Sequence, residues 1–119
     1  MIKIVFHQNM FRLGFFVALL AIEFLATTTI EISVVESMWD KSNHFIAFFV
    51  LYIMLSLGYK NLKIWQSFLL LLAFAIQIEV VQHFIEGRYA SFLDIVADCI
   101  GIIIGILFCK IFKPSKYFL

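Results

Sequence analysis

The sequence FLLLLAFAI at residues 68–76 lies within a longer apolar run that extends from about Ile64 to Phe84. A helix on the surface of a soluble protein needs a polar stripe along one side. Four consecutive leucines followed by Ala-Phe-Ala-Ile leave no such stripe, because every face of a helix over these residues is apolar. At 1.5 Å per residue the whole run can cross about 30 Å of hydrocarbon. This stretch therefore predicts a transmembrane helix.

The composition of the whole chain indicates the same class of protein. Of the 119 residues, 64% are hydrophobic and 14% are charged, whereas soluble domains carry about 25% charged residues. The mean hydropathy is +1.04. We therefore exclude a water-soluble core and expect one integral-membrane domain over residues 1–119. The formal net charge of +1 gives no basis for a nucleic-acid partner.

Three further apolar runs accompany the first, and each holds roughly 18–21 residues, which is enough to span a bilayer. The four predicted helices cover about residues 13–30, 42–59, 64–84 and 91–112. Short links join them, so consecutive helices are expected to run antiparallel. The predicted fold class is all-α, a four-helix transmembrane bundle.

Basic residues are distributed unevenly between the two sides of this predicted bundle. One side carries Lys3, Arg12, Lys60, Lys63, Lys110, Lys113 and Lys116, whereas the other carries only Lys41 and Arg88. Loops rich in lysine and arginine stay in the cytoplasm. We therefore expect both termini and the link at residues 59–63 to be cytoplasmic, and the link at 85–90 to face outward.

Polar residues gather near the predicted outward ends of the helices. They are Asp40, His44, Glu79, Gln82, His83, Asp94 and Asp98. At 1.5 Å per residue, each lies within about 10 Å of an outward helix end. Three pairs among them are spaced i,i+4, so each pair is expected to share a helix face. An ionised group costs roughly 2.5–3.5 kcal/mol at the centre of a membrane helix, so these groups must pair or line a wet cavity.

Three short patterns in this region resemble the VanZ-like family of small bacterial membrane proteins. They are Asp40-Lys41-x-x-His44-Phe45, Glu79-x-x-Gln82, and Arg88-x-x-Ser91-x-x-Asp94-x-x-x-x-x-x-Gly101-x-x-x-Gly105. The resemblance covers about residues 38–106. It implies a multi-pass protein of the bacterial cytoplasmic membrane, related to one linked to low-level teicoplanin resistance. The family often carries Asn at the position of Asp98, so this chain has an additional carboxylate there.

The leading functional hypothesis is an outward-facing site for the polar headgroup of a membrane lipid or cell-wall precursor. Its ligand-binding candidates are Asp40, Lys41, His44, Gln82, Arg88 and Ser91. Arginine binds a phosphate bidentately, and lysine binds it as a point charge. The carboxylates and Gln82 would bind sugar or peptide groups. The alternative without a ligand is a structural network that fixes helix packing in a membrane assembly partner.

Glu79, Asp94 and Asp98 are the catalytic candidates if the chain is an intramembrane enzyme acting on a lipid or glycan headgroup. Two carboxylates in different environments can serve as acid and base. No nucleophile beside a base is visible in the sequence, so enzymatic activity stays open. Glu23, in the first predicted helix, is expected either to join these carboxylates or to pair with another helix.

The sequence contains no local metal-binding motif such as HExxH, and it indicates no cofactor. His44 and His83 are the weak metal candidates, since imidazole and carboxylate together suit several divalent ions. Gly101-x-x-x-Gly105 is typical of close helix packing, either within the bundle or between copies in a homo-oligomer.

Overall fold

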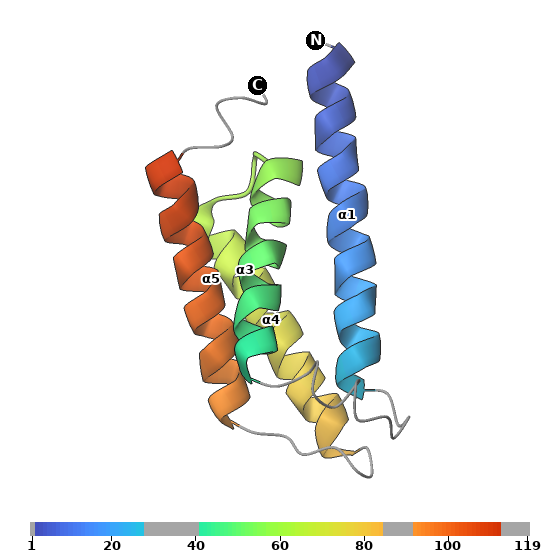
Figure 1. Cartoon of the computed structure of the whole chain (residues 1–119), viewed down its shortest axis with the longest axis vertical. Helices are drawn as coiled ribbons and strands as arrows, with labels where there is room; N and C mark the ends of the chain where they lie inside the picture. The colour runs from blue at the N-terminus through green and yellow to red at the C-terminus, as the bar shows by residue number, and fades with distance from the viewer. Residues whose placement is uncertain (1, 28–40, 85–91, 113–119) are drawn as a thin grey trace.

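The computed structural model describes residues 2–27, 41–84 and 92–112 of the chain, and these residues form four α-helices. The helices are α1 (Ile2–Thr27), α3 (Lys41–Gly58), α4 (Ile64–His83) and α5 (Phe92–Phe112). They run alternately up and down, so that α1 begins at the end of the bundle where α5 finishes (Figure 1). The predicted all-α, antiparallel four-helix fold is confirmed.

Three of the described helices are long and apolar enough to cross a membrane: Gln8–Thr27 within α1, and the whole of α4 and α5. Their outward faces carry large apolar side chains, such as Leu20, Leu69 and Leu107, that are each more than half exposed. An apolar exterior of this extent suits hydrocarbon and would drive aggregation in water. The membrane class predicted from composition is consistent with this exterior.

The helix α1 begins at Ile2 rather than near residue 13, which corrects the predicted start of the first helix. Residues 2–12 contain neither glycine nor proline, so nothing in the sequence stops the helix from extending toward the N-terminus. The apolar part, Gln8–Thr27, still lies close to the predicted span. The predicted continuation at residues 28–30 falls outside the described residues.

The helix α3 spans 18 residues, Lys41–Gly58, which agrees closely with the helix predicted at 42–59. Its described apolar part, His44–Gly58, is shorter than those of the other three helices. The helix contacts α1, α4 and α5, so much of its surface is covered by protein, although Ile46 is exposed. Phe48 and Leu51 are fully buried in the resulting core, together with Leu71 of α4 and Ile102 of α5.

The closest packing in the bundle is between α3 and α5, at the two glycines of the GxxxG pattern. A Cβ at Gly101 would collide with the backbone oxygen of Phe45, and a Cβ at Gly105 would lie 3.0 Å from Cβ of Tyr52. The face of these glycines is therefore occupied within the chain. Of the two arrangements predicted for Gly101 and Gly105, close packing within the bundle is the one observed; a homo-oligomer remains a prediction.

The turn between α3 and α4 is fixed by local hydrogen bonds. The Tyr59 amide donates to the carbonyl of Leu55 at 2.9 Å, and the Leu62 amide donates to that of Tyr59 at 3.2 Å. The side-chain oxygen of Gln66 accepts a bond of 2.9 Å from the Lys63 amide, which satisfies a donor at the start of α4. This tight link places α4 beside α3 and brings its far end to the level of His44.

Candidate functional site

His44, in the first turn of α3, is the centre of the candidate site. Its Nδ1 lies 2.8 Å from Oδ1 of Asp98 on α5, and the side chains of both residues are almost fully buried, at 1% and 0% exposure. The contact depends on the close approach of α3 and α5 at Gly101, one turn further along α5. The carboxylate accepts the Nδ1 proton in the neutral imidazole, which leaves Nε2 as the basic nitrogen.

Two further carboxylates lie close to the imidazole ring, and that of Asp94 is on its Nε2 side. Nε2 is 3.8 Å from Oδ2 of Asp94, which lies one turn before Asp98 on α5. Ligand atoms of His44, Glu79 and Asp94 all lie within 4.8 Å of one another. The His44 cluster, defined as His44, Glu79, Asp94 and Asp98, thus draws on three helices. In Figure 1 the start of α3, the end of α4 and the start of α5 lie at the same end of the bundle.

The cluster lies inside the bundle rather than at its surface. At 1.5 Å per residue, Asp98 is about 9 Å along α5 from Phe92, and Glu79 is about 6 Å from the end of α4. His44 lies about 4.5 Å along α3 from its start at Lys41. Glu79 is only 6% exposed, whereas Asp94 is partly open. Of the cluster's carboxylates, Asp94 is therefore the one with direct access from the bundle end.

The charge of the cluster requires compensation. It contains three carboxylates and one imidazole, and a buried charge is stable only when it is paired or neutralised. The basic residues whose side chains the structure describes, namely Arg12, Lys60, Lys63 and Lys110, all belong to the opposite end of the bundle. The described part of the site therefore attracts a cation or protons, and by itself it would repel a bare phosphate.

Gln82, a predicted ligand-binding residue, has a structural contact in this bundle. Its Nε2 donates a hydrogen bond of 2.6 Å to the carbonyl oxygen of Ala26, which ties α4 to the end of α1. Gln82 is 3% exposed, and its side-chain oxygen has no hydrogen-bond partner among the described residues. The sequence carried no signal for the Ala26 contact, because a backbone acceptor can occur at any residue.

Glu23 does not join the cluster. Its Oε1 accepts a hydrogen bond of 2.7 Å from Nε2 of Gln77, on a different part of α4. The backbone oxygen of Glu23 accepts a second bond, of 2.6 Å, from the hydroxyl of Thr27. Of the two possibilities left open by the sequence, pairing with another helix is the one observed, with an amide rather than a hydroxyl as the partner.

The other predicted site residues divide into two groups. Asp40, Arg88 and Ser91 lie outside the described residues, and Lys41 begins α3 but its side chain is not described. His83 is corrected as a metal candidate, since its ring is exposed and packs edge-on against Phe84, outside the group of ligand atoms around His44. The i,i+4 spacing placed His83 near Glu79 but did not reveal that the last turn of α4 turns it outward.

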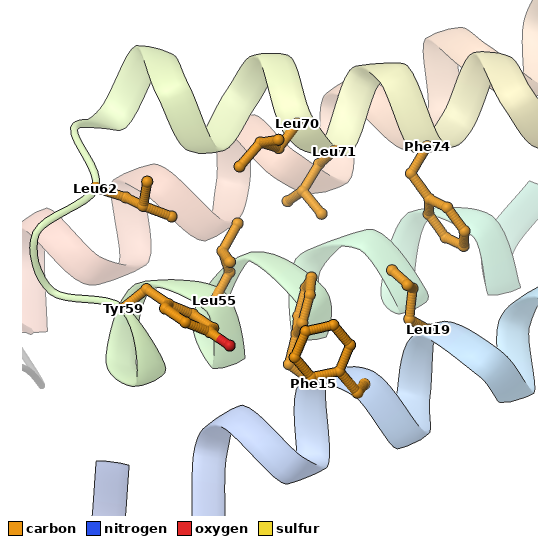
Figure 2. Close-up of a pocket in the computed structure, with 9 residues that line it drawn as sticks. Phe15, Leu19, Leu55, Tyr59, Leu62, Leu70, Leu71 and Phe74 are labelled. Carbon is orange, nitrogen blue, oxygen red and sulfur yellow. The ribbon is translucent and has the colours of Figure 1, made fainter. Parts of the chain in front are cut away.

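Two hollows show where a ligand can approach the molecule. One, of about 250 Å³, lies between α4 and α5 and reaches Glu79 of the cluster; its other lining residues are Ile76, Val80, His83, Phe84 and Ile95. A second, of about 320 Å³, lies between α1, α3 and α4 near the opposite end (Figure 2). The second is lined by apolar and aromatic side chains, so it suits an apolar group but has no carboxylate, imidazole or basic side chain in its lining. Of these two hollows, the first is the one lined by a carboxylate and an imidazole side chain, those of Glu79 and His83.

Comparison with known proteins identifies the family. The sequence profile described as VanZ/LLP1 matches residues 3–113, which includes α1 and extends well beyond the segment that carried the resemblance. No curated protein and no solved structure matches the chain. Since the match covers nearly the whole sequence, this helical chain with membrane-spanning capacity belongs to the VanZ/LLP1 family.

Proposed function

We propose that this protein is a multi-pass protein of the bacterial cytoplasmic membrane that binds the polar headgroup of a lipid or lipid-linked cell-wall precursor. The observation that carries the proposal is the His44 cluster, a set of ionisable side chains buried where α3, α4 and α5 meet. Burying such groups among membrane helices is costly, so they commonly mark a functional site.

The position of the cluster supports a ligand that arrives from the membrane. The hollow beside Glu79 opens between two helices that can both span the bilayer. A lipid can therefore keep its chains in hydrocarbon while its headgroup reaches the level of Glu79. Lys41 and Arg88, the basic residues predicted for the outward side, supply the phosphate-binding cations in this proposal. The family resemblance adds the expectation of a link to teicoplanin resistance.

A second candidate function is an intramembrane enzyme that acts on the same headgroup. It is favoured by the pairing of His44 with Asp98, because a buried carboxylate that holds Nδ1–H orients an imidazole as a general base. In this case Nε2 would accept a proton, and Glu79 or Asp94 would serve as the acid. Asp98 would then be a positioning residue, since it lies on the far side of the ring.

Native mass spectrometry of the protein in mild detergent tests the binding function. We expect a co-purifying lipid or polyprenyl-linked adduct on the wild type. The adduct should be lost in Glu79→Gln and kept in Glu23→Gln, which makes the same chemical change at a partly exposed glutamate outside the cluster. No adduct on the wild type, or equal retention in both variants of unchanged fold, would contradict the proposal.

A further inference from the structure

We infer that His44, Glu79 and Asp94 form a binding site for one divalent first-row metal ion, such as Zn²⁺ or Mn²⁺. Metal binding at these residues goes beyond the headgroup proposal and stands without it. Its role in holding a headgroup phosphate, by contrast, rests on the proposed function.

The chemistry of the three ligand atoms suits such an ion. The cluster offers one imidazole nitrogen and two carboxylate oxygens, and imidazole favours transition metals over Mg²⁺ and Ca²⁺. Three protein ligands with one or more open positions are typical of catalytic rather than structural metal sites. The open positions would accept water or a phosphate oxygen.

The distances are within reach of coordination. Zinc binds nitrogen and oxygen at about 2.0–2.2 Å, which places tetrahedral ligand atoms about 3.4 Å apart. The three ligand atoms now lie within 4.8 Å of one another, and the separation between His44 and Asp94 is 3.8 Å. The longest separation must therefore shorten by roughly 1.4 Å. Since the separation between His44 and Asp94 is shorter, the longest separation involves Glu79, and rotations of the Glu79 and Asp94 side chains must together supply this movement.

The bond between His44 and Asp98 is a second, independent feature of a metal site. A histidine that binds a metal commonly donates its other ring N–H to a carboxylate, which fixes the tautomer and the ring orientation. Asp98 lies 2.8 Å from Nδ1, whereas Asp94 is on the Nε2 side of the ring. The basic nitrogen thus faces Asp94, and Glu79 lies nearby.

The charge balance also favours a dication. Two carboxylates with a neutral imidazole cancel the charge of one M²⁺ ion, and Asp98 is then stabilised by its bond to the metal-bound histidine. The competing arrangement has no metal: a protonated His44 bridges Asp94 and Asp98, and Glu79 is neutral. The two arrangements differ in a measurable way, because only the first binds a metal with a stoichiometry of one.

Titration of the EDTA-washed protein in detergent with ZnCl₂ and with MnCl₂, followed by calorimetry and native mass spectrometry, tests the inference. We expect one ion per chain and a rise in thermal midpoint on addition of the metal. His83→Gln is the matched control, since it removes an exposed histidine outside the cluster. His44→Gln should abolish binding while His83→Gln leaves it unchanged. Asp98→Asn should weaken binding about 10–100-fold.

If His44→Gln does not fold, Asp94→Asn replaces it, because Asp94 is the least buried ligand and its loss leaves the bond between His44 and Asp98 in place. Absence of binding to the wild type would overturn the inference, and so would equal binding by the folded cluster variants. Repeating the lipid measurement after EDTA separates the two proposals. A lipid adduct that persists without metal, with no metal binding, leaves only the headgroup function; metal binding without any adduct leaves only the metal site.

Discussion

His44 and Asp98 are 54 positions apart in the sequence, yet their side chains meet at 2.8 Å in the most buried part of the polar cluster. This single contact joins the start of α3 to the second turn of α5. It also determines which nitrogen of the imidazole faces Asp94. The packing of the bundle and the chemistry of the candidate site therefore depend on the same pair of residues.

Removal of the carboxylate at Asp98 should destabilise the protein. In Asp98→Ala the buried imidazole loses its acceptor, and breaking a buried pair costs about 3 kcal/mol. In Asp98→Asn an acceptor oxygen remains, so we expect a smaller loss of about 1 kcal/mol. Thermal denaturation in detergent, followed by tryptophan fluorescence, measures both. An Asp98→Ala variant as stable as the wild type would argue against the observed contact.

Gly101→Ala should disturb the site although residue 101 is not part of it. The added Cβ meets the backbone oxygen of Phe45, which cannot rotate away, so α3 and α5 must separate. Overpacking of this kind costs about 1–3 kcal/mol, and here it should also weaken metal binding at His44. Gly14→Ala is the control, because its Cβ would meet only the flexible end of Met54 at 3.6 Å. Both variants are compared by thermal midpoint and by Zn²⁺ titration.

Gln82→Met should separate a structural from a ligand-binding role for Gln82. The substitution roughly keeps the volume but removes the donor to the carbonyl of Ala26. Hydrogen bonds between membrane helices contribute about 0.6 kcal/mol on average, so we expect a small loss of stability and an unchanged lipid adduct. Loss of the adduct from a stable variant would instead assign Gln82 to the ligand.

Arg12→Lys should destabilise the opposite end of the bundle. The Nε of Arg12 donates a bond of 2.6 Å to the carbonyl of Gly58, and its guanidinium lies 4.7 Å from the centre of the Tyr59 ring. A lysine ammonium lacks the planar geometry for both contacts, so we expect a loss of about 1 kcal/mol. Lys63→Ala, at an exposed residue, should change the free energy of unfolding by less than about 0.5 kcal/mol. Chemical denaturation measures the difference between the two.

The predicted orientation of the protein can be tested by cysteine labelling in cells. In a background with Cys99 and Cys109 replaced by alanine, we expect Glu86→Cys to react with a membrane-impermeant maleimide added outside. Lys60→Cys should react only after the cells are opened, because its basic link is expected in the cytoplasm. The reverse labelling pattern would show that the bundle has the opposite orientation, with the His44 cluster at the cytoplasmic side.

The sequence by itself determined the number, type and approximate position of the described helices. Apolar runs such as residues 68–76 have no polar face, and their length matches the bilayer, so local composition was sufficient. It also indicated that His44, Glu79, Asp94 and Asp98 lie at one level, since the rise per residue fixes depth along each helix. Its error, the start of α1, concerns a helix end, where composition changes gradually.

Only the tertiary structure decided which polar groups meet. Depth along a helix follows from residue number, but rotation about the helix axis follows from how neighbouring helices pack. The contact at Gly101 sets the rotation of α5 against α3, and this rotation places Asp98 within hydrogen-bond distance of His44. The same packing turns Glu79 inward and leaves His83 exposed, although the two residues are one turn apart. Sequence spacing fixes which residues share a face within one helix, whereas the partner of a buried side chain depends on how another helix packs against it.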